Sequence, residues 1–292
     1  MGISEVRHMI EEGRRYEAAG NHDRALQRYR AAEEAAEDPA ARSEAIRRQS
    51  DVHRTRSEWS EATESAEQAE RVASAHGLDD LVAEAINAKG AVFHNRGELD
   101  EAEPYYNRAI EMAKHPRVSG IVMQNLGTLA AQRGDLETAS TRFKEAYDSC
   151  KEGGYERGML FALMNYARSM FEQGNNETAE RLLKEAEVLA ISMMDLDISH
   201  LAALNRAEAM IQRGAYEEAE TLVSSALGYY GNSGNPYRRL EALRLLGDIT
   251  VKRGPRDQAR IFYQAAADLA EKIEAGQEID VLRSRLANLD EI

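Results

Sequence analysis

The sequence predicts an all-α fold, a solenoid of seven helical hairpins, and three observations support this prediction. First, one short phrase recurs along the 292 residues: GNHDRA at residue 20, SEWSEA at 57, GELDEA at 97, GDLETA at 134, GNNETA at 174, GAYEEA at 214 and GPRDQA at 254. Second, successive phrases begin 37 or 40 residues apart. Third, stretches of about 17 residues on either side of each phrase carry apolar residues at helical intervals, and nothing reads as a strand.

Each phrase marks the connection between the two helices of a hairpin. Its first residue, a glycine in all phrases except the second, is expected to end the first helix in a left-handed conformation. The acidic residue three positions later is expected in the first turn of the second helix, where it complements the helix dipole; the second phrase has Ser60 there. The closing alanine lets the two helices approach closely. These residues are therefore interpreted as packing residues.

The repeats are expected to fill residues 1–275, and the segment after them is expected to cap the solenoid. The units are placed at about residues 3–39, 42–77, 79–116, 117–154, 156–194, 196–232 and 236–275. In the remaining segment, 276–292, Ile279, Leu282, Leu286 and Leu289 recur on one helical face. A solenoid needs its last apolar face covered, which favours a capping helix. The alternative is a detachable helix that docks into a groove or onto a second chain.

The repeats resemble the tetratricopeptide repeat family, in which glycines, alanines and large apolar residues occupy fixed positions. The fourth unit matches at Leu126, Gly127, Gly134, Ala139, Phe143 and Ala146. The second unit is the weakest match, with Ser50 and Ser57 in place of both glycines. Units of about 40 residues look like those of kinesin light chains, spindle-orientation adaptors and bacterial peptide-binding regulators of the Rap and Rgg type. The resemblance implies a right-handed superhelical solenoid with a concave binding surface.

Composition and charge restrict the classes of partner. The formal net charge is −14, which argues against a nucleic-acid partner, because nucleic acid requires a basic surface. The longest apolar run, residues 159–164, is far shorter than a membrane-spanning helix, so no membrane association is expected. The sequence also has only one cysteine and starts with a charged segment that lacks the apolar core of a secretory signal. These features predict a cytoplasmic protein.

Motifs that carry chemistry are missing from the sequence. The seven histidines are scattered, and no pair has the spacing of a metal site. No phosphate-binding glycine loop, dinucleotide-binding fingerprint or nucleophile elbow occurs. We therefore predict no catalytic residue, no metal and no cofactor, and a protein that is not an enzyme.

The first helices of the hairpins carry the predicted binding residues. Asn125, Asn165 and Asn205 recur at 40-residue intervals, and a carboxamide can pair with both the C=O and the N–H of a peptide backbone. The resemblance implies this role for asparagine at this position. The neighbouring predicted groove residues are Ile121, Gln124, Phe161, Met164, Arg168, Phe171, Leu201 and Leu204. The alternatives are that the asparagines hydrogen-bond to neighbouring helices and that the apolar residues pack between units.

A second candidate surface lies in the first two units. Arg14, Arg47, Arg48 and Arg54 project to one predicted side, with Glu44 and Asp51 among them. Guanidinium groups bind carboxylates well, so this patch is a candidate for an acidic ligand. The alternative is a face on which the arginines and acids neutralise one another.

The predicted function is a non-enzymatic scaffold that holds a segment of another protein, or a peptide, in the concave groove. Two alternatives stay open. One is a sensory module that binds a short signalling peptide. The other is a structural protein that self-assembles into homo-oligomers through the C-terminal helix and Tyr229 and Tyr230.

Overall fold

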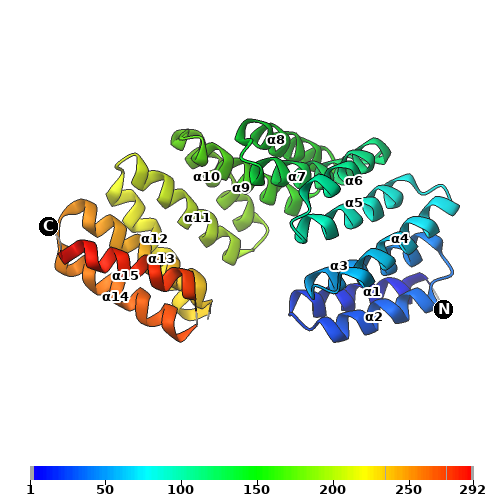
Figure 1. The fold of residues 1–292 in the computed structure, drawn as a ribbon, viewed down its shortest axis with the longest axis horizontal. Coiled ribbons are helices and arrows are strands. Elements are labelled where there is room, and N and C mark those ends of the chain that lie inside the picture. The colour runs from blue at the N-terminus through cyan, green and yellow to red at the C-terminus, as the bar shows by residue number, and fades with distance from the viewer. Residues whose placement is uncertain (1–2, 234, 274, 291–292) are drawn as a thin grey trace. The chain divides into compact units, whose positions relative to one another are not determined.

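The computed structural model describes residues 3–233, 235–273 and 275–290 (Figure 1). The described residues form fifteen α-helices and no strand. The helices are α1 (Ile3–Ala18), α2 (His22–Ala35), α3 (Pro39–Thr55), α4 (Trp59–Ala75), α5 (Asp79–Asn95), α6 (Leu99–Met112), α7 (Pro116–Gln132), α8 (Leu136–Glu152), α9 (Glu156–Glu172), α10 (Asn176–Ser192), α11 (Leu196–Gln212), α12 (Tyr216–Ser233), α13 (Pro236–Arg253), α14 (Arg256–Lys272) and α15 (Gly276–Asp290). Consecutive helices pack in pairs, which confirms the predicted all-α class of fold.

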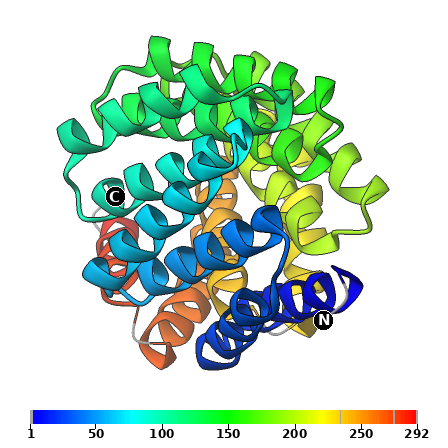
Figure 2. The same ribbon diagram turned by 90° about the vertical axis from the view of Figure 1, so that its right-hand side faces the viewer.

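The chain divides into two compact units, and the division falls inside α9. Unit 1 comprises residues 1–162 and unit 2 residues 163–292. Within unit 1, the pairs α1/α2, α3/α4, α5/α6 and α7/α8 each form an antiparallel hairpin (Figure 2). Within unit 2, α11/α12 and α13/α14 do the same. The helix α3 begins at Pro39, inside the residues assigned to the first predicted unit, because Asp38 caps its backbone N–H groups and proline suits the first helical position.

The first residue of each recurring phrase is left-handed, as the sequence predicted. The six glycines have φ between 71° and 114°. Ser57 takes the same conformation in the second hairpin, with φ of 59°, although a side chain is strained there. The connection geometry is therefore kept even where its preferred residue is missing.

Some of the hairpins bring together two residues that lie 16 positions apart in the sequence. In four hairpins a glycine of the first helix faces an aromatic ring of the second. A Cβ atom added to Gly13, Gly90, Gly127 or Gly247 would lie 2.3–2.8 Å from the ring of Tyr29, Tyr106, Phe143 or Tyr263, respectively. In the sequence, the same spacing relates Ser50 to Ala66, Ala167 to Leu183 and Ala207 to Val223. In the four glycine hairpins an aromatic ring on one helix is thus matched by the smallest residue on the other, which keeps the interior densely packed.

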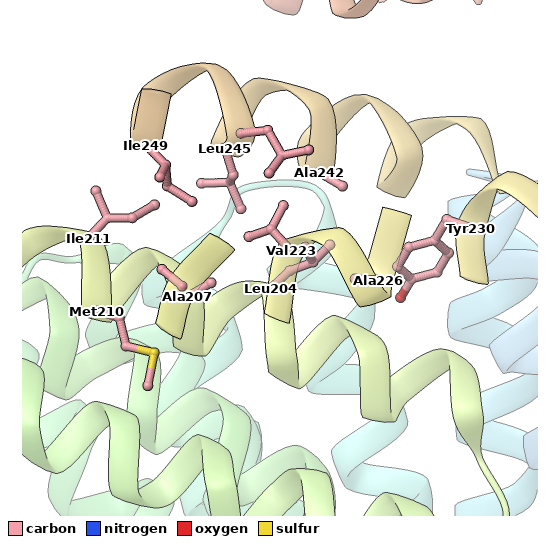
Figure 3. Packing of buried hydrophobic residues seen from close by; sticks show 12 residues of the cluster. Leu204, Ala207, Met210, Ile211, Val223, Ala226, Tyr230, Ala242, Leu245 and Ile249 are labelled. Carbon is pink, nitrogen blue, oxygen red and sulfur yellow. The ribbon is translucent and has the colours of Figure 1, made fainter. Parts of the chain in front are cut away.

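The core of unit 2 lies between α11, α12 and α13. Leu204, Val223 and Leu245 project into the space between these helices, with Ile249 and Ala207 beside them (Figure 3). All five side chains are buried. This core holds α11 so that its remaining faces are free to line a cavity.

The helix α15 covers the end of unit 2. Leu282 and Leu289 are buried against α13 and α14, and Ile279 and Leu286 pack beside them. These are the four residues that the sequence placed on one helical face. Residues 291–292 of the predicted capping segment lie outside the described residues. In this structure α15 is docked on its neighbouring helix, α14.

Two further properties of the described part of the chain concern membranes and metals. None of its helices is both long enough and apolar enough to cross a bilayer. Within the same residues, no three His, Cys, Asp or Glu side chains gather in an arrangement that would hold a metal ion.

Candidate functional site: two cavities lined by first helices

Unit 1 contains a cavity of about 620 Å³ that is lined chiefly by the first helices of its hairpins, α3, α5 and α7, and by the start of α9. We call this the unit 1 cavity. Seven of the predicted binding residues line it: Arg47, Arg48, Arg54, Ile121, Gln124, Asn125 and Phe161. Its volume is in the range of sites that bind small ligands or peptide side chains.

Four arginines of the unit 1 cavity share two carboxylates. The oxygens of Asp51 lie 3.0 Å from Arg47 Nη1, 3.6 Å from Arg54 Nη2 and 3.9 Å from Arg48 Nη1. Glu84 Oε2 lies 3.1 Å from Arg47 Nε, and the other oxygen of Glu84 is paired with Arg117. Cations therefore outnumber anions on the walls of this cavity, in a protein whose net charge is −14.

Arg47 is the structural centre of this cluster. Burial disfavours its charged form, but the carboxylates of Glu84, Asp51 and Glu44 outweigh burial and raise the pKa of Arg47. Arg14, which the sequence grouped with these arginines, does not line the cavity. It forms ion pairs of 2.7 Å with Glu11 and 2.6 Å with Glu44. The predicted patch is thus three arginines of α3 joined by Arg117 of α7.

The carboxamides of the unit 1 cavity are already engaged. Asn125 Nδ2 donates to Asn87 Oδ1 at 2.7 Å, and Gln124 Nε2 donates to the carbonyl of Gly158 at 3.0 Å. Asn125 therefore behaves as the alternative interpretation expected, hydrogen-bonding to a neighbouring helix. Phe161, in contrast, lines this cavity and is 38% exposed overall.

Unit 2 contains a second cavity, of about 420 Å³, between α9, α10, α11 and α13. We call this the unit 2 cavity. Six of the predicted groove residues line it: Met164, Asn165, Arg168, Phe171, Leu201 and Asn205. Neither the Asn165 nor the Asn205 side chain forms a hydrogen bond with any residue in the described part of the chain. Their donors and acceptors are therefore free to bind a ligand.

Two residues differ from what the sequence predicted. Leu204 is fully buried in the core of unit 2 and does not line the cavity, because it packs between α11, α12 and α13 (Figure 3). Tyr230, named as a contact for self-assembly, is 1% exposed, and its hydroxyl donates to the carbonyl of Asp197 at 2.8 Å. Its neighbour Tyr229 stacks on His200 with ring centroids 4.4 Å apart. Tyr230 is therefore a core residue.

Several cavity residues were not predicted from the sequence. Asn87 and Arg117 line the unit 1 cavity, and Glu208 lines the unit 2 cavity. Glu208 follows Asn205 by three positions on α11, so helical spacing alone places it beside that asparagine. In a chain with 51 acidic residues, a single glutamate gave no reason to single it out.

Comparison with known proteins agrees with this architecture. Residues 85–118 match the family model described as tetratricopeptide repeat. No curated protein sequence matches the chain. This match covers one tetratricopeptide repeat, and helical hairpins of the same architecture recur along both units.

Solved structures show the same fold at low sequence identity. A signal transduction ATPase with numerous domains from Pyrococcus horikoshii, a protein with a tetratricopeptide repeat sensor, matches with a TM-score of 0.73 at 14% identity, over 96% of this chain and 45% of that one. The chain thus spans less than half the length of that ATPase. A Rap protein complexed with Competence and Sporulation Factor matches with a TM-score of 0.64 at 16% identity, over 100% of this chain and 76% of that one.

A further structure contains repeats of a kinesin light chain from Podospora anserina. It matches with a TM-score of 0.56 at 14% identity, over 66% of this chain and 96% of that one. The Rap protein and the kinesin light chain represent two of the groups whose repeat length the sequence resembles. At such identities the similarity establishes the fold.

Proposed function

We propose that this protein is a non-enzymatic scaffold that binds a segment of a partner protein, or a peptide, through the cavities that the first helices of its hairpins line within each unit. One observation carries the proposal. Asn165 and Asn205, 40 residues apart in sequence, line one cavity and leave their carboxamides unused by the described residues. A carboxamide can pair with the C=O and N–H of an extended chain irrespective of that chain's sequence.

The apolar residues of the unit 2 cavity would supply most of the affinity. A hydrogen bond contributes about 0.5–1.5 kcal/mol, whereas a micromolar complex requires about 8 kcal/mol. Burial of an apolar ligand side chain contributes about 1.5–3 kcal/mol, and Met164, Phe171 and Leu201 offer a surface for such burial. The asparagines would fix the backbone and these residues would hold the side chains.

The unit 1 cavity favours an acidic ligand group. Arg48, Arg54 and Arg117 line it, and each shares its carboxylate partner with another arginine. An aspartate or glutamate of the bound segment would supply a further acceptor. A cytoplasmic location and the division into seven units remain part of this proposal.

The sensory alternative has one supporting observation. A Rap protein of the same fold was crystallised with Competence and Sporulation Factor, so this fold accommodates a factor of that kind. A short peptide and a segment of a larger protein would use the same cavity residues. The two kinds of ligand can be distinguished experimentally, because only a short signalling peptide would bind fully as a free synthetic peptide. Self-assembly through the exposed side of α15, where Val281 is 43% exposed, is the remaining alternative.

The test is a pull-down from lysate followed by mass spectrometry, with Asn165→Ala/Asn205→Ala as the variant. Asn107→Ala serves as the matched control, because Asn107 is exposed on α6 away from both cavities. We expect a protein that wild type and the control retain and the double variant loses. Retention by all three proteins would move the binding site off the unit 2 cavity. Recovery of the chain's own copies alone would favour self-assembly.

A further inference from the structure

The charged side chains of the unit 2 cavity pair unequally. Three glutamates and two arginines line it. Arg168 Nε lies 2.9 Å from Glu172 Oε1, and Arg238 Nη1 lies 2.9 Å from Glu241 Oε2. Both lining arginines therefore have a glutamate of their own, and Glu208 is left over.

Glu208 has one weak ion partner. Its Oε1 lies 3.8 Å from Arg244 Nη2, while Arg244 Nη1 lies 3.3 Å from Asp248 Oδ2. Glu208 thus shares Arg244 with a second carboxylate. It accepts no hydrogen bond from any residue in the described ranges. The cavity therefore carries an under-compensated negative charge.

The environment of Glu208 opposes this charge. Burial raises the pKa of the Glu208 carboxyl, Arg244 and Arg168 act against the rise, and Glu241 and Asp248 add to it. A cationic group that entered the cavity would reverse this balance, since an opposite charge a few ångströms away stabilises the ionised form. A positively charged ligand group would thus neutralise the carboxylate of Glu208.

On these grounds we propose that the unit 2 cavity selects a segment that places a lysine or arginine side chain at Glu208. This inference rests on the proposed function and deepens it by naming the chemistry of the bound segment. The aliphatic stem of the ligand residue would lie along Phe171 and Leu201, because long cationic side chains bury their methylenes on apolar surface. Asn165 and Asn205 would hold the backbone on either side. Glu208 is then the specificity-determining residue of the site.

An acidic segment fits this cavity less well. The two arginines that line it are each bound to a glutamate, so an incoming carboxylate would have to displace that partner. It would also lie near Glu208, and like charges brought together cost binding energy. The observations therefore favour the cationic ligand.

The test is selection from a random peptide library displayed on phage, with the full chain immobilised. The variants are Glu208→Gln, which removes the charge at nearly constant shape, and Glu208→Lys, which inverts it. Glu177→Gln is the matched control, because Glu177 is an exposed glutamate in the first turn of α10 outside the cavity. Selected sequences are then synthesised with lysine and with norleucine at the same position, and both peptides are titrated calorimetrically.

We expect wild type and the control to enrich lysine and arginine and to bind the lysine peptide about tenfold more tightly than the norleucine peptide. Glu208→Gln should abolish this preference, and Glu208→Lys should select acidic peptides. Peptides selected without enrichment in lysine or arginine, or a preference that Glu208→Gln leaves intact, would overturn the inference and leave the proposed function standing. If wild type selects no peptide, the proposed function fails, and this inference fails with it. If circular dichroism shows that Glu208→Gln is not folded, the affinities of wild type for the lysine and norleucine peptides still test the inference.

Discussion

Gly127 of α7 packs against the ring of Phe143 of α8 so closely that a Cβ atom on Gly127 would lie 2.8 Å from Phe143 Cδ1. Both residues are buried. The absence of a side chain at position 127 is therefore what allows a phenylalanine at position 143.

Gly127→Ala should destabilise the protein. Alanine favours the helix by about 1 kcal/mol over glycine, but overpacking a filled core costs about 1–3 kcal/mol, so we expect a net loss of about 1 kcal/mol. Urea unfolding followed by circular dichroism measures it. Gly127→Ala/Phe143→Leu reproduces the Ala167 and Leu183 pair found at the same spacing, and it should recover stability. A double variant no more stable than Gly127→Ala would contradict the steric explanation.

Ser57→Gly should stabilise the protein. Ser57 has φ of 59°, a conformation that disfavours a side chain by about 1–2 kcal/mol. Glycine removes this strain, but part of the gain is lost because glycine has more conformational freedom in the unfolded chain. The expected gain is about 0.5–1 kcal/mol in the free energy of unfolding. The reciprocal change, Gly134→Ser at φ of 81°, should lower stability by a similar amount. Thermal unfolding of both variants provides the comparison. Melting temperatures that shift in the same direction in Ser57→Gly and Gly134→Ser would contradict the prediction.

The asparagines of the two cavities should respond differently to truncation. Asn125 and Asn87 hydrogen-bond to each other, so a double-mutant cycle with alanine at both positions should give a coupling energy of about 0.5–1.5 kcal/mol. Asn165→Ala should change stability by less than about 0.5 kcal/mol, because no described residue loses a hydrogen bond. Chemical unfolding of the five proteins measures both quantities. A large loss in Asn165→Ala would show that this residue is structural.

Glu208 predicts a pH dependence of stability. Burial raises its pKa in the folded state above the value in the unfolded chain, so its contribution to stability is fully present below the unfolded pKa and is lost as the pH rises through the folded pKa. Glu208→Gln stays neutral and should be the more stable protein at about pH 8, with the difference shrinking towards about pH 4. Melting temperatures of wild type and variant across this range provide the measurement. If the melting temperature of Glu208→Gln exceeded that of wild type by more at low pH than at high pH, the prediction would be wrong.

The hairpins and their connections were predictable because they depend on local properties: the period of apolar residues and the left-handed glycine. The pairing of residues 16 positions apart was visible in the sequence only as a list of glycines and aromatic residues, since their contact requires two helices to be docked. Leu204 and Asn205 show a second limit. Adjacent residues on a helix are rotated by about 100°, so one lies in the core and the other lines a cavity, and the packing of α12 and α13 decides which.

Charged residues were the least predictable part of the site. The arginines of α3 could be grouped from sequence, but their carboxylate partner Glu84 lies on α5 and the fourth arginine, Arg117, on α7. Which ions neutralise one another depends on distances of a few ångströms between helices. The sequence therefore located the cavities approximately and left their net charge undetermined.

The matched pairs within the hairpins also decide how such a protein can exchange parts in evolution or in the laboratory. In four hairpins the glycine of the first helix leaves room for an aromatic ring of the second, whereas Ala167 and Leu183 stand at the same spacing between α9 and α10. A chimera that joins α7 to α10 would set Gly127 opposite Leu183 and leave a void, whereas α9 joined to α8 would press Ala167 into Phe143. Crossovers placed between hairpins would keep each of these pairs together.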